Sequence, residues 1–354
     1  MLHDVDPVRL SRRRFTAGLV GAAGAALLGG VAACDSGDKP AAASKDQPIE
    51  KVTYLTGFGT FGRESYAWVA QAKGFFRDAG LEVTIQAGAA GDANHEALTS
   101  GKAQFAAVDA SGAFTRYARG DDTSFQIVAA IQQQTLLSII TLDGKLNTPK
   151  SLEGRTIGVA TGAAPKTIFP AYARLAGIDQ SKVNWVNSTP QALNSLLVGG
   201  KIDGAGLFVV GVPAVEKAAG GRKATVLPYS TYLNDLFGTV LVTPKALIEK
   251  QPDQVRRFTG ALMQGLLYAV DHPEEAGDIL HKSEPTQDPA VAAAELKLMR
   301  PYVLPTKGAT IGVLEPSRVA RTIALLQSAG LFTAPLTAEQ IVRGDLLGTA
   351  PAAA

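Results

Sequence analysis

The chain has 354 residues, a formal net charge of +2, a hydrophobic share of 46% and a single cysteine. Because residues 1–33 carry four arginines and two aspartates, the rest of the chain has no net charge, and this excludes the basic surface typical of nucleic-acid-binding proteins. One cysteine excludes an intramolecular disulfide and a thiolate metal cluster, and the four scattered histidines show no metal-ligand spacing. No GxGxxG, GxxxxGK(S/T) or GxSxG motif is expected in a strand–turn–helix setting.

Residues 9–34 predict export across a bacterial membrane. Arg9 and the arginines at 12–14 precede a run of Gly, Ala, Val and Leu at 16–33, which is too weakly apolar for a stable transmembrane helix but typical of a signal peptide. The segment SRRRF resembles the twin-arginine export motif, and VAAC resembles the lipobox, whose cysteine receives a diacylglyceryl group. We expect a signal peptide at 1–33 and a lipid anchor on Cys34 at the extracytoplasmic face of the cell membrane.

The rest of the chain predicts a flexible tether and then alternating strands and helices. Residues 34–48 are rich in Asp, Ser, Lys, Ala and Pro and have little to bury, as in a tether. Strands are expected at 51–56, 81–86, 103–108, 125–134 and 135–143, and helices at 63–80, 92–101 and 111–120. After a proline-bearing break at 144–154, strands are expected at 155–161, 182–187, 202–210 and 224–229, with helices at 165–177, 189–200 and 213–220. Residues 237–244 predict a further strand, and residues 245–346 are almost wholly helical.

This alternation predicts an α/β fold of two lobes. Buried strands that alternate with helices form mostly parallel sheets covered by helices on both faces. The restart of the pattern indicates a second unit inserted into the first. We therefore expect lobe 1 at 49–142 plus 240–347 and lobe 2 at 143–239.

Three stretches resemble a known family. They are AWVAQAKGFFRDAGLEVTI followed by ALTSGKAQFAAVD, then SLEGRTIGVATG, and lastly PDQVRRFTGALMQGLLYAVDHPEEAGDIL. They resemble the solute-binding proteins of the sulfonate, nitrate and thiamine-precursor type, the NMT1/THI5-like group. The resemblance implies a type II periplasmic-binding-protein-like fold with a ligand cleft between the lobes. It also implies a monomer without a cofactor that delivers a small solute to the permease subunits of an ABC importer.

Candidate ligand-binding residues in the first lobe follow from the strand ends, because ligands of open α/β sheets bind beyond the carboxyl ends of the strands. The stretch GFGTFGRESYAW follows the first strand and supplies Phe58, Phe61, Arg63, Glu64, Tyr66 and Trp68. Arg63 is expected either to pair with an anionic ligand or to lie in solvent at a helix end. Tyr66 and Trp68 face either the cleft or the core. After the third strand, Asp109 and Ser111 either contact the ligand or cap a helix.

The second lobe and the crossings between lobes supply the remaining candidates. The segment TGAAPK opens a helix after a strand, so its backbone N–H groups suit an anion or a carbonyl, with Thr161 and Lys166 nearby. Phe208 ends a strand, where a ring can stack on a planar ligand. Gln132 lies near one crossing, and Tyr229 and Asn234 lie on the other. No catalytic or metal-binding residue is expected.

The mixture of aromatic rings and carboxylates favours a planar heterocycle that donates hydrogen bonds, such as an aminopyrimidine, a thiamine precursor or a riboflavin-like vitamin. The alternative is a sulfonate or nitrate held by Arg63, Thr161 and Lys166. A third hypothesis is a pyrimidine-synthase-like enzyme, as in fungal relatives that use a cysteine-rich segment and a histidine. It is disfavoured because the only cysteine is the expected anchor and His95 is the only histidine near a first-lobe loop.

Overall fold

The computed structural model describes residues 49–349 apart from residues 90, 162, 305–307 and 309. The predicted signal peptide, lipidated Cys34 and tether lie outside the described residues and remain predictions. In the described part of the chain, no helix combines the length and the hydrophobicity needed to cross a bilayer.

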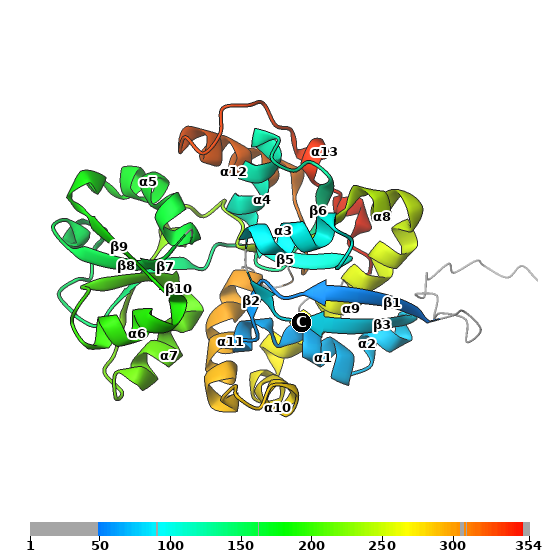
Figure 1. The fold of residues 1–354 in the computed structure, drawn as a ribbon, viewed down its shortest axis with the longest axis horizontal. Helices are drawn as coiled ribbons and strands as arrows, with labels where there is room; N and C mark the ends of the chain where they lie inside the picture. Colours follow the sequence, from blue (N-terminus) through cyan, green and yellow to red (C-terminus); the bar gives the residue numbers. More distant parts are fainter. Residues whose placement is uncertain (1–48, 90, 162, 305–307, 309, 350–354) are drawn as a thin grey trace, which may run out of the picture. The chain divides into compact units, whose positions relative to one another are not determined.

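A five-stranded sheet forms the first half of the fold (Figure 1). Its strands, in spatial order, are β3 (Leu81–Gln86), β1 (Glu50–Leu55), β5 (Phe105–Asp109), β12 (Thr239–Pro244) and β6 (Phe125–Ala130). β1 is parallel to β3 and β5, whereas β12 is antiparallel to both of its neighbours. The carboxyl ends of β1, β3 and β5 therefore meet at one edge.

Short helices follow these strands. They are η1 (Gly62–Glu64), α1 (Tyr66–Ala72), α2 (Phe75–Asp78), α3 (Gly91–Thr99) and α4 (Ala110–Arg119), and a small ladder pairs β2 (Phe58–Gly59) with β4 (Gly88–Ala89). The prediction of one continuous helix over 63–80 is wrong. Gly74 has a left-handed φ of 80°, which ends α1 and lets α2 leave in a new direction.

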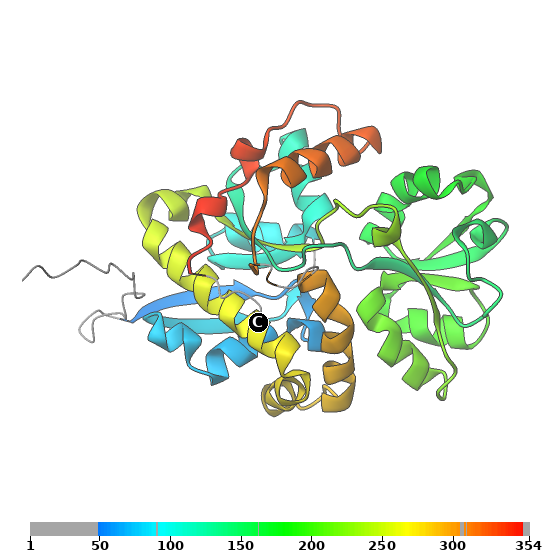
Figure 2. The same cartoon turned by 180° about the vertical axis from the view of Figure 1, so that it is seen from behind.

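The C-terminal third is helical, as predicted, and its elements are α8 (Lys245–Lys250), α9 (Pro252–Asp271), α10 (Pro273–Ser283), α11 (Pro289–Val303), α12 (Pro316–Ser328), α13 (Ala338–Ile341) and η6 (Gly344–Leu346). Helix α9 runs across the first sheet (Figure 2). The ring of Phe258 on α9 stacks between Phe105 and Phe76, at centroid distances of 3.8 and 5.4 Å. Gly265 lets α9 approach α1, because a Cβ there would lie 2.4 Å from the carbonyl oxygen of Tyr66.

A second five-stranded sheet contains β11 (Thr225–Pro228), β7 (Leu137–Thr141), β10 (Gly204–Phe208), β8 (Thr156–Ala160) and β9 (Asn184–Ser188) in that order. β8 is parallel to β9 and β10, and β7 is antiparallel to both of its neighbours. Figure 1 shows α5 (Ala164–Ala176) on one side of this sheet and α6 (Pro190–Val198) and α7 (Val212–Ala218) on the other. The short helices are η2 (Pro149–Leu152), η3 (Gln180–Lys182), η4 (Val209–Gly211) and η5 (Tyr229–Thr231).

The second sheet begins earlier than the predicted lobe boundary. β7 was expected in lobe 1, which ended at residue 142, but it pairs with β10 and β11. Two crossing segments, 131–136 and 229–238, join the sheets. They are hydrogen-bonded to each other, with the N–H of Thr135 donating to the carbonyl of Leu236 at 2.9 Å.

Candidate functional site

Arg63 lies near one aromatic ring from the loop after β1 and one from the second sheet. Its guanidinium carbon is 4.7 Å from the ring centroid of Phe61 and 5.3 Å from that of Phe208 at the end of β10. The rings of Phe58 and Phe61 stack at 6.0 Å. The structure thus brings together four of the residues that the sequence singled out, including one from the second sheet. Phe61 is 38% exposed.

Two buried carboxylates share the charge of Arg63. Glu64 lies 3.7 Å from its Nε and accepts hydrogen bonds from the backbone N–H of Gly57 and the hydroxyl of Tyr66. Glu295 on α11 accepts from the backbone N–H of Arg63 at 3.1 Å. The two glutamates are 4% and 3% exposed, and burial raises the pKa of each above its usual range, although Arg63 opposes this shift. We call Phe58, Phe61, Arg63, Glu64, Phe208 and Glu295 the Arg63 cluster.

The loop that carries this cluster has the spacing GxGxxG, since Gly57, Gly59 and Gly62 stand between β1 and η1. In dinucleotide-binding folds such a loop places a pyrophosphate against the N–H groups of a helix start. Here Glu64 and Glu295 accept from the N–H groups of Gly57 and Arg63. The carboxylates of two glutamates in the chain therefore bind the N–H groups that a phosphate would otherwise contact. The expectation that no GxGxxG motif stands in a strand–turn–helix setting is therefore wrong, since these three glycines have that spacing between a strand and a helix.

Gly62 explains why α11 reaches the loop. A Cβ at this position would lie 2.4 Å from the Cα of Ala292, so only glycine allows η1 to pack directly on α11. This contact brings Glu295 to the backbone of Arg63. Glu295 was missed in the sequence because it lies 232 positions from Arg63 in a helix with no site-like motif.

Asp109 caps α4 at the carboxyl end of β5. Its Oδ1 accepts from the N–H groups of Ser111 and Gly112 at 3.0 and 3.3 Å and from the hydroxyl of Ser111. Burial raises the pKa of Asp109 above its usual value, although these hydrogen bonds oppose the shift. The helix-cap alternative for this residue is therefore observed. Thr239 pairs with Asp109 across the sheet and comes within 3.8 Å of a Cβ placed on Gly57, so Asp109 lies next to the loop of the Arg63 cluster.

Four other candidates are buried in structural contacts. Tyr66 is 1% exposed and its hydroxyl is hydrogen-bonded to that of Tyr54 at 2.8 Å, and Trp68 belongs to the core. Tyr229 stacks on Tyr172 at 4.3 Å and donates to the carbonyl of Pro165. Gln132 is 4% exposed, and its side-chain oxygen accepts from the N–H of Thr239. These side chains position the surrounding backbone.

Three candidates of the second half of the fold and its crossing are exposed, namely Thr161, Lys166 and Asn234. Thr161 and Lys166 flank the start of α5, whose N-cap residue Ala163 supplies no capping side chain. Asn234 is also exposed, and its backbone carbonyl accepts from Arg318. The structure does not bring Thr161, Lys166 or Asn234 into the contacts that define the Arg63 cluster.

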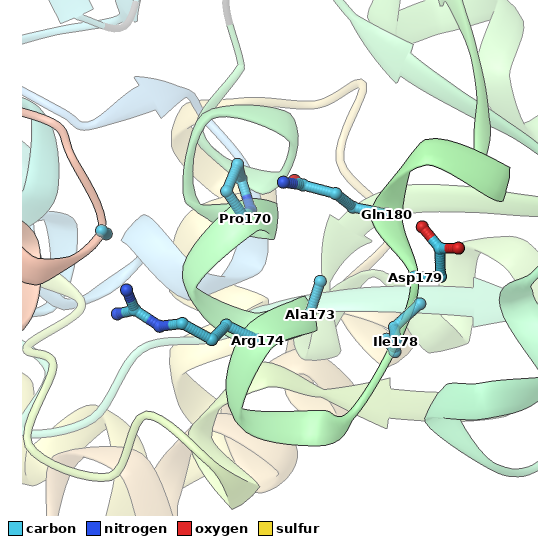
Figure 3. Close-up of a pocket in the computed structure, with 7 residues that line it drawn as sticks. Pro170, Ala173, Arg174, Ile178, Asp179 and Gln180 are labelled. Carbon is cyan, nitrogen blue, oxygen red and sulfur yellow. The ribbon is translucent and has the colours of Figure 1, made fainter.

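A hollow of about 380 Å³ lies against α5, away from the predicted residues. Figure 3 shows that Arg174 points away from Asp179 there. Arg174 is engaged, since it donates to the backbone and side chain of Ser328 at the end of α12. The hollow is lined by Pro170, Ala173, Arg174, Ile178, Asp179, Gln180 and Ala329, and it includes none of the predicted site residues. Among the described residues, no group of three His, Cys, Asp or Glu side chains could hold a metal ion.

Comparisons with known proteins identify the family and the fold. The family model described as NMT1/THI5 like matches residues 65–276. The chain is 25% identical over 295 residues to a riboflavin-binding protein of Chloroflexus aurantiacus, covering 79% of this chain and 81% of that protein. It is 22% identical over 249 residues to a formylaminopyrimidine-binding protein of Halalkalibacterium halodurans, covering 67% of this chain and 72% of that protein.

The structure of the periplasmic aliphatic sulphonate binding protein SsuA of Escherichia coli superposes with a TM-score of 0.65 at 16% identity, covering 83% of this chain and 92% of that one. The predicted periplasmic-binding-protein-like fold is confirmed.

Proposed function

Because the chain belongs to the NMT1/THI5-like family, we propose that it is an extracytoplasmic solute-binding protein that passes a small molecule to the permease of an ABC importer. We further propose that the ligand is an uncharged or cationic heterocycle with N–H donors, of the aminopyrimidine or riboflavin-like class. Both named relatives bind ligands of this kind, according to their descriptions.

The observation that carries the ligand class is the charge of the Arg63 cluster. Two buried glutamates face one arginine, so the cluster holds more negative than positive charge when both carboxylates are ionised. An anionic ligand would add a further negative charge where little water is present to screen it. A ring with amino or imino groups would instead donate hydrogen bonds to carboxylate oxygens in this region.

The aromatic residues supply the complementary surface for such a ligand. Phe58 and Phe61 lie parallel within 19°, and Phe208 comes from the other sheet. Planar ligands gain from offset stacking on such rings. Asp109 lies next to the loop that carries Phe58 and Phe61. Its capping hydrogen bonds all use Oδ1, so Oδ2 can accept from a ligand.

The alternative ligand is a sulfonate or nitrate at the start of α5. The N–H groups of that helix start lack a capping side chain, and Thr161 and Lys166 are exposed beside them. Anions bind at such helix starts. This alternative makes the opposite prediction for the ligand's charge, so one panel of compounds separates the two.

The test is a thermal-shift and calorimetry panel on the chain from residue 43 onward. The panel contains riboflavin, formylaminopyrimidine, thiamine, taurine, an alkanesulfonate and nitrate. A ligand at 100 times its Kd stabilises the fold by about 2.7 kcal/mol, which gives a clear rise in Tm. We expect a heterocycle to bind and the Glu64→Gln variant to bind it less tightly.

Two outcomes contradict parts of this proposal. Binding of an anion that Lys166→Ala abolishes and Glu64→Gln leaves intact would transfer the site to the start of α5. Turnover of any bound heterocycle, followed by chromatography of the reaction mixture, would contradict the assignment as a binding protein. The exposed Lys102→Ala variant serves as the matched control, since Lys102 lies away from both candidate sites.

A further inference from the structure

The two crossing segments are hydrogen-bonded to the C-terminal part of the chain at Gln133 and Asp235. The N–H of Gln133 donates to the carbonyl of Tyr302 at 2.6 Å, and its side-chain amide donates to the carbonyl of Val313 at 2.8 Å. In the other crossing, Asp235 accepts from Arg321 through its side chain and from Thr322 through its backbone carbonyl.

Arg318 on α12 binds both crossings at once. Its Nη1 donates to the side-chain oxygen of Gln133 at 3.1 Å, and its Nη2 donates to the backbone carbonyls of Gln133 and Asn234. Its guanidinium also lies 4.4 Å from the ring centroid of Phe237 in the second crossing. The planar guanidinium suits this task, because its donors diverge in fixed directions and reach two strands together.

Helix α12 is itself packed against both halves of the fold. Val319, Ile323 and Leu326 lie in the same core cluster as Phe114 of α4 and Phe169 of α5. Ser328 at the end of α12 also accepts hydrogen bonds from Arg174 of α5. Motions between lobes are absorbed by a few backbone residues in the connecting segments. Because Arg318 of α12 is hydrogen-bonded to both segments, the backbone dihedral angles near Gln133 and Asn234 are restrained.

We propose that Arg318 is a positioning residue that locks the two crossings into one hinge and thereby restricts the range of lobe arrangements in the ligand-free protein. The proposal assigns Arg318 no contact with ligand. It rests on the hydrogen bonds of α12 and holds whichever solute the protein binds. It rests on the proposed function only because solute capture requires the two lobes to move about a hinge.

The chain offers a matched control in Arg321. This residue lies one turn further along α12 and binds Asp235 of the second crossing, and its other hydrogen bond goes to Ser317 within α12. A general loosening of α12 would follow from changing either arginine. A change in hinge coupling is expected only for Arg318, because of the two arginines it alone has hydrogen bonds to both crossings.

The experiment measures the distance between spin labels on the two halves of the ligand-free full chain. The chain carries Cys34→Ser, together with Lys102→Cys and Lys201→Cys. Lys102 is exposed in the turn after α3 of the first half, and Lys201 is exposed in the turn after α6 of the second half. We expect Arg318→Gln to broaden the distance distribution and add populations absent from the parent, and Arg321→Gln to leave it unchanged. Arg318→Lys, which has no fork to span both crossings, should resemble Arg318→Gln.

An unchanged distribution in folded Arg318→Gln overturns the proposal, and so does equal broadening in the Arg321→Gln control. If Arg318→Gln fails to fold, the Arg318→Lys variant decides in the same way. Because no ligand is added, these outcomes are independent of the compound panel, so failure of the hinge proposal and failure of the binding proposal remain distinguishable.

Discussion

The carboxylate of Glu295 accepts a hydrogen bond from the backbone N–H of Arg63, although 232 positions separate the two residues in the chain. Through this bond, a C-terminal helix holds the loop that follows the first strand. Asp288, the N-cap residue of the same helix, forms an ion pair with Lys217 on α7 beside the second sheet. Helix α11 therefore contacts both halves of the fold next to the Arg63 cluster.

Replacing Glu295 tests whether this bond positions the loop. Glu295→Ala removes a buried acceptor, and we expect the free energy of unfolding to fall by about 1–3 kcal/mol. Glu295→Gln keeps an acceptor oxygen while removing a charge that burial makes costly, so its loss should be smaller. Urea unfolding at neutral pH measures both. Lys297 also lies on α11, where it forms an exposed ion pair with Glu274 of α10, and Lys297→Ala should stay within about 0.5 kcal/mol. An equal loss for Gln and Ala would mean that the charge, rather than the acceptor, matters.

Asp109 has one oxygen engaged as a helix cap, and among the described residues no donor is bonded to Oδ2. Asp109→Ala should lower stability by about 1 kcal/mol through loss of the cap, whereas Asp109→Asn should preserve most of it. If Oδ2 also accepts from the ligand, both variants should raise Kd at least about fivefold, the scale of one lost polar contact. Calorimetry with the best compound of the panel measures this. Unchanged affinity in both variants would restrict Asp109 to its capping role.

His95 makes stability depend on pH. Burial, assisted by the charge of Arg116, lowers the pKa of His95 to about 4 from its usual value of 6.5. Between pH 6.5 and pH 4, His95 is therefore protonated in the unfolded chain but not in the folded chain. The free energy of unfolding keeps the full contribution of His95 above pH 6.5 and falls as the pH drops toward 4. The loss from this residue is roughly 3 kcal/mol.

Urea unfolding between pH 7 and pH 5 measures this effect. His95→Leu should flatten the curve, because the buried Nδ1 of His95 has no hydrogen-bond partner among the described residues and its ring already packs on Phe125. His281→Gln, at an exposed position, should keep the slope because His95 remains. A slope that persists in His95→Leu would assign the pH dependence to other groups.

Cys34 tests the predicted anchor. Cys34→Ser removes the thiol that a lipid would modify, so we expect the protein to move from the membrane to the soluble or secreted fraction of the expressing cells. Fractionation followed by immunoblotting measures this shift, with Ser36→Ala as the neighbouring control. Membrane association that survives in Cys34→Ser would remove the lipoprotein assignment.

The alternation of strands and helices was readable because it depends on local periodicity. Runs such as those of β1, β3 and β5 are short and apolar, and the sequence placed them correctly. Errors arose where a local signal had two readings. The sequence predicted one helix through Gly74, yet the positive φ of this residue ends the helix. The strand β7 was assigned to the wrong sheet, because strand propensity does not specify the pairing partner.

The sequence by itself determined two α/β units, the segments between strands and helices at which candidate residues collect, and a family resemblance that the comparisons confirm. Each of these features is encoded by neighbours along the chain. Only the tertiary structure decided which charges meet at the first loop. Glu295 reaches Arg63 because glycine at position 62 permits close packing on α11, and Arg318 reaches both crossings because α12 packs beside them. Such contacts depend on the packing of distant segments, which no local pattern records.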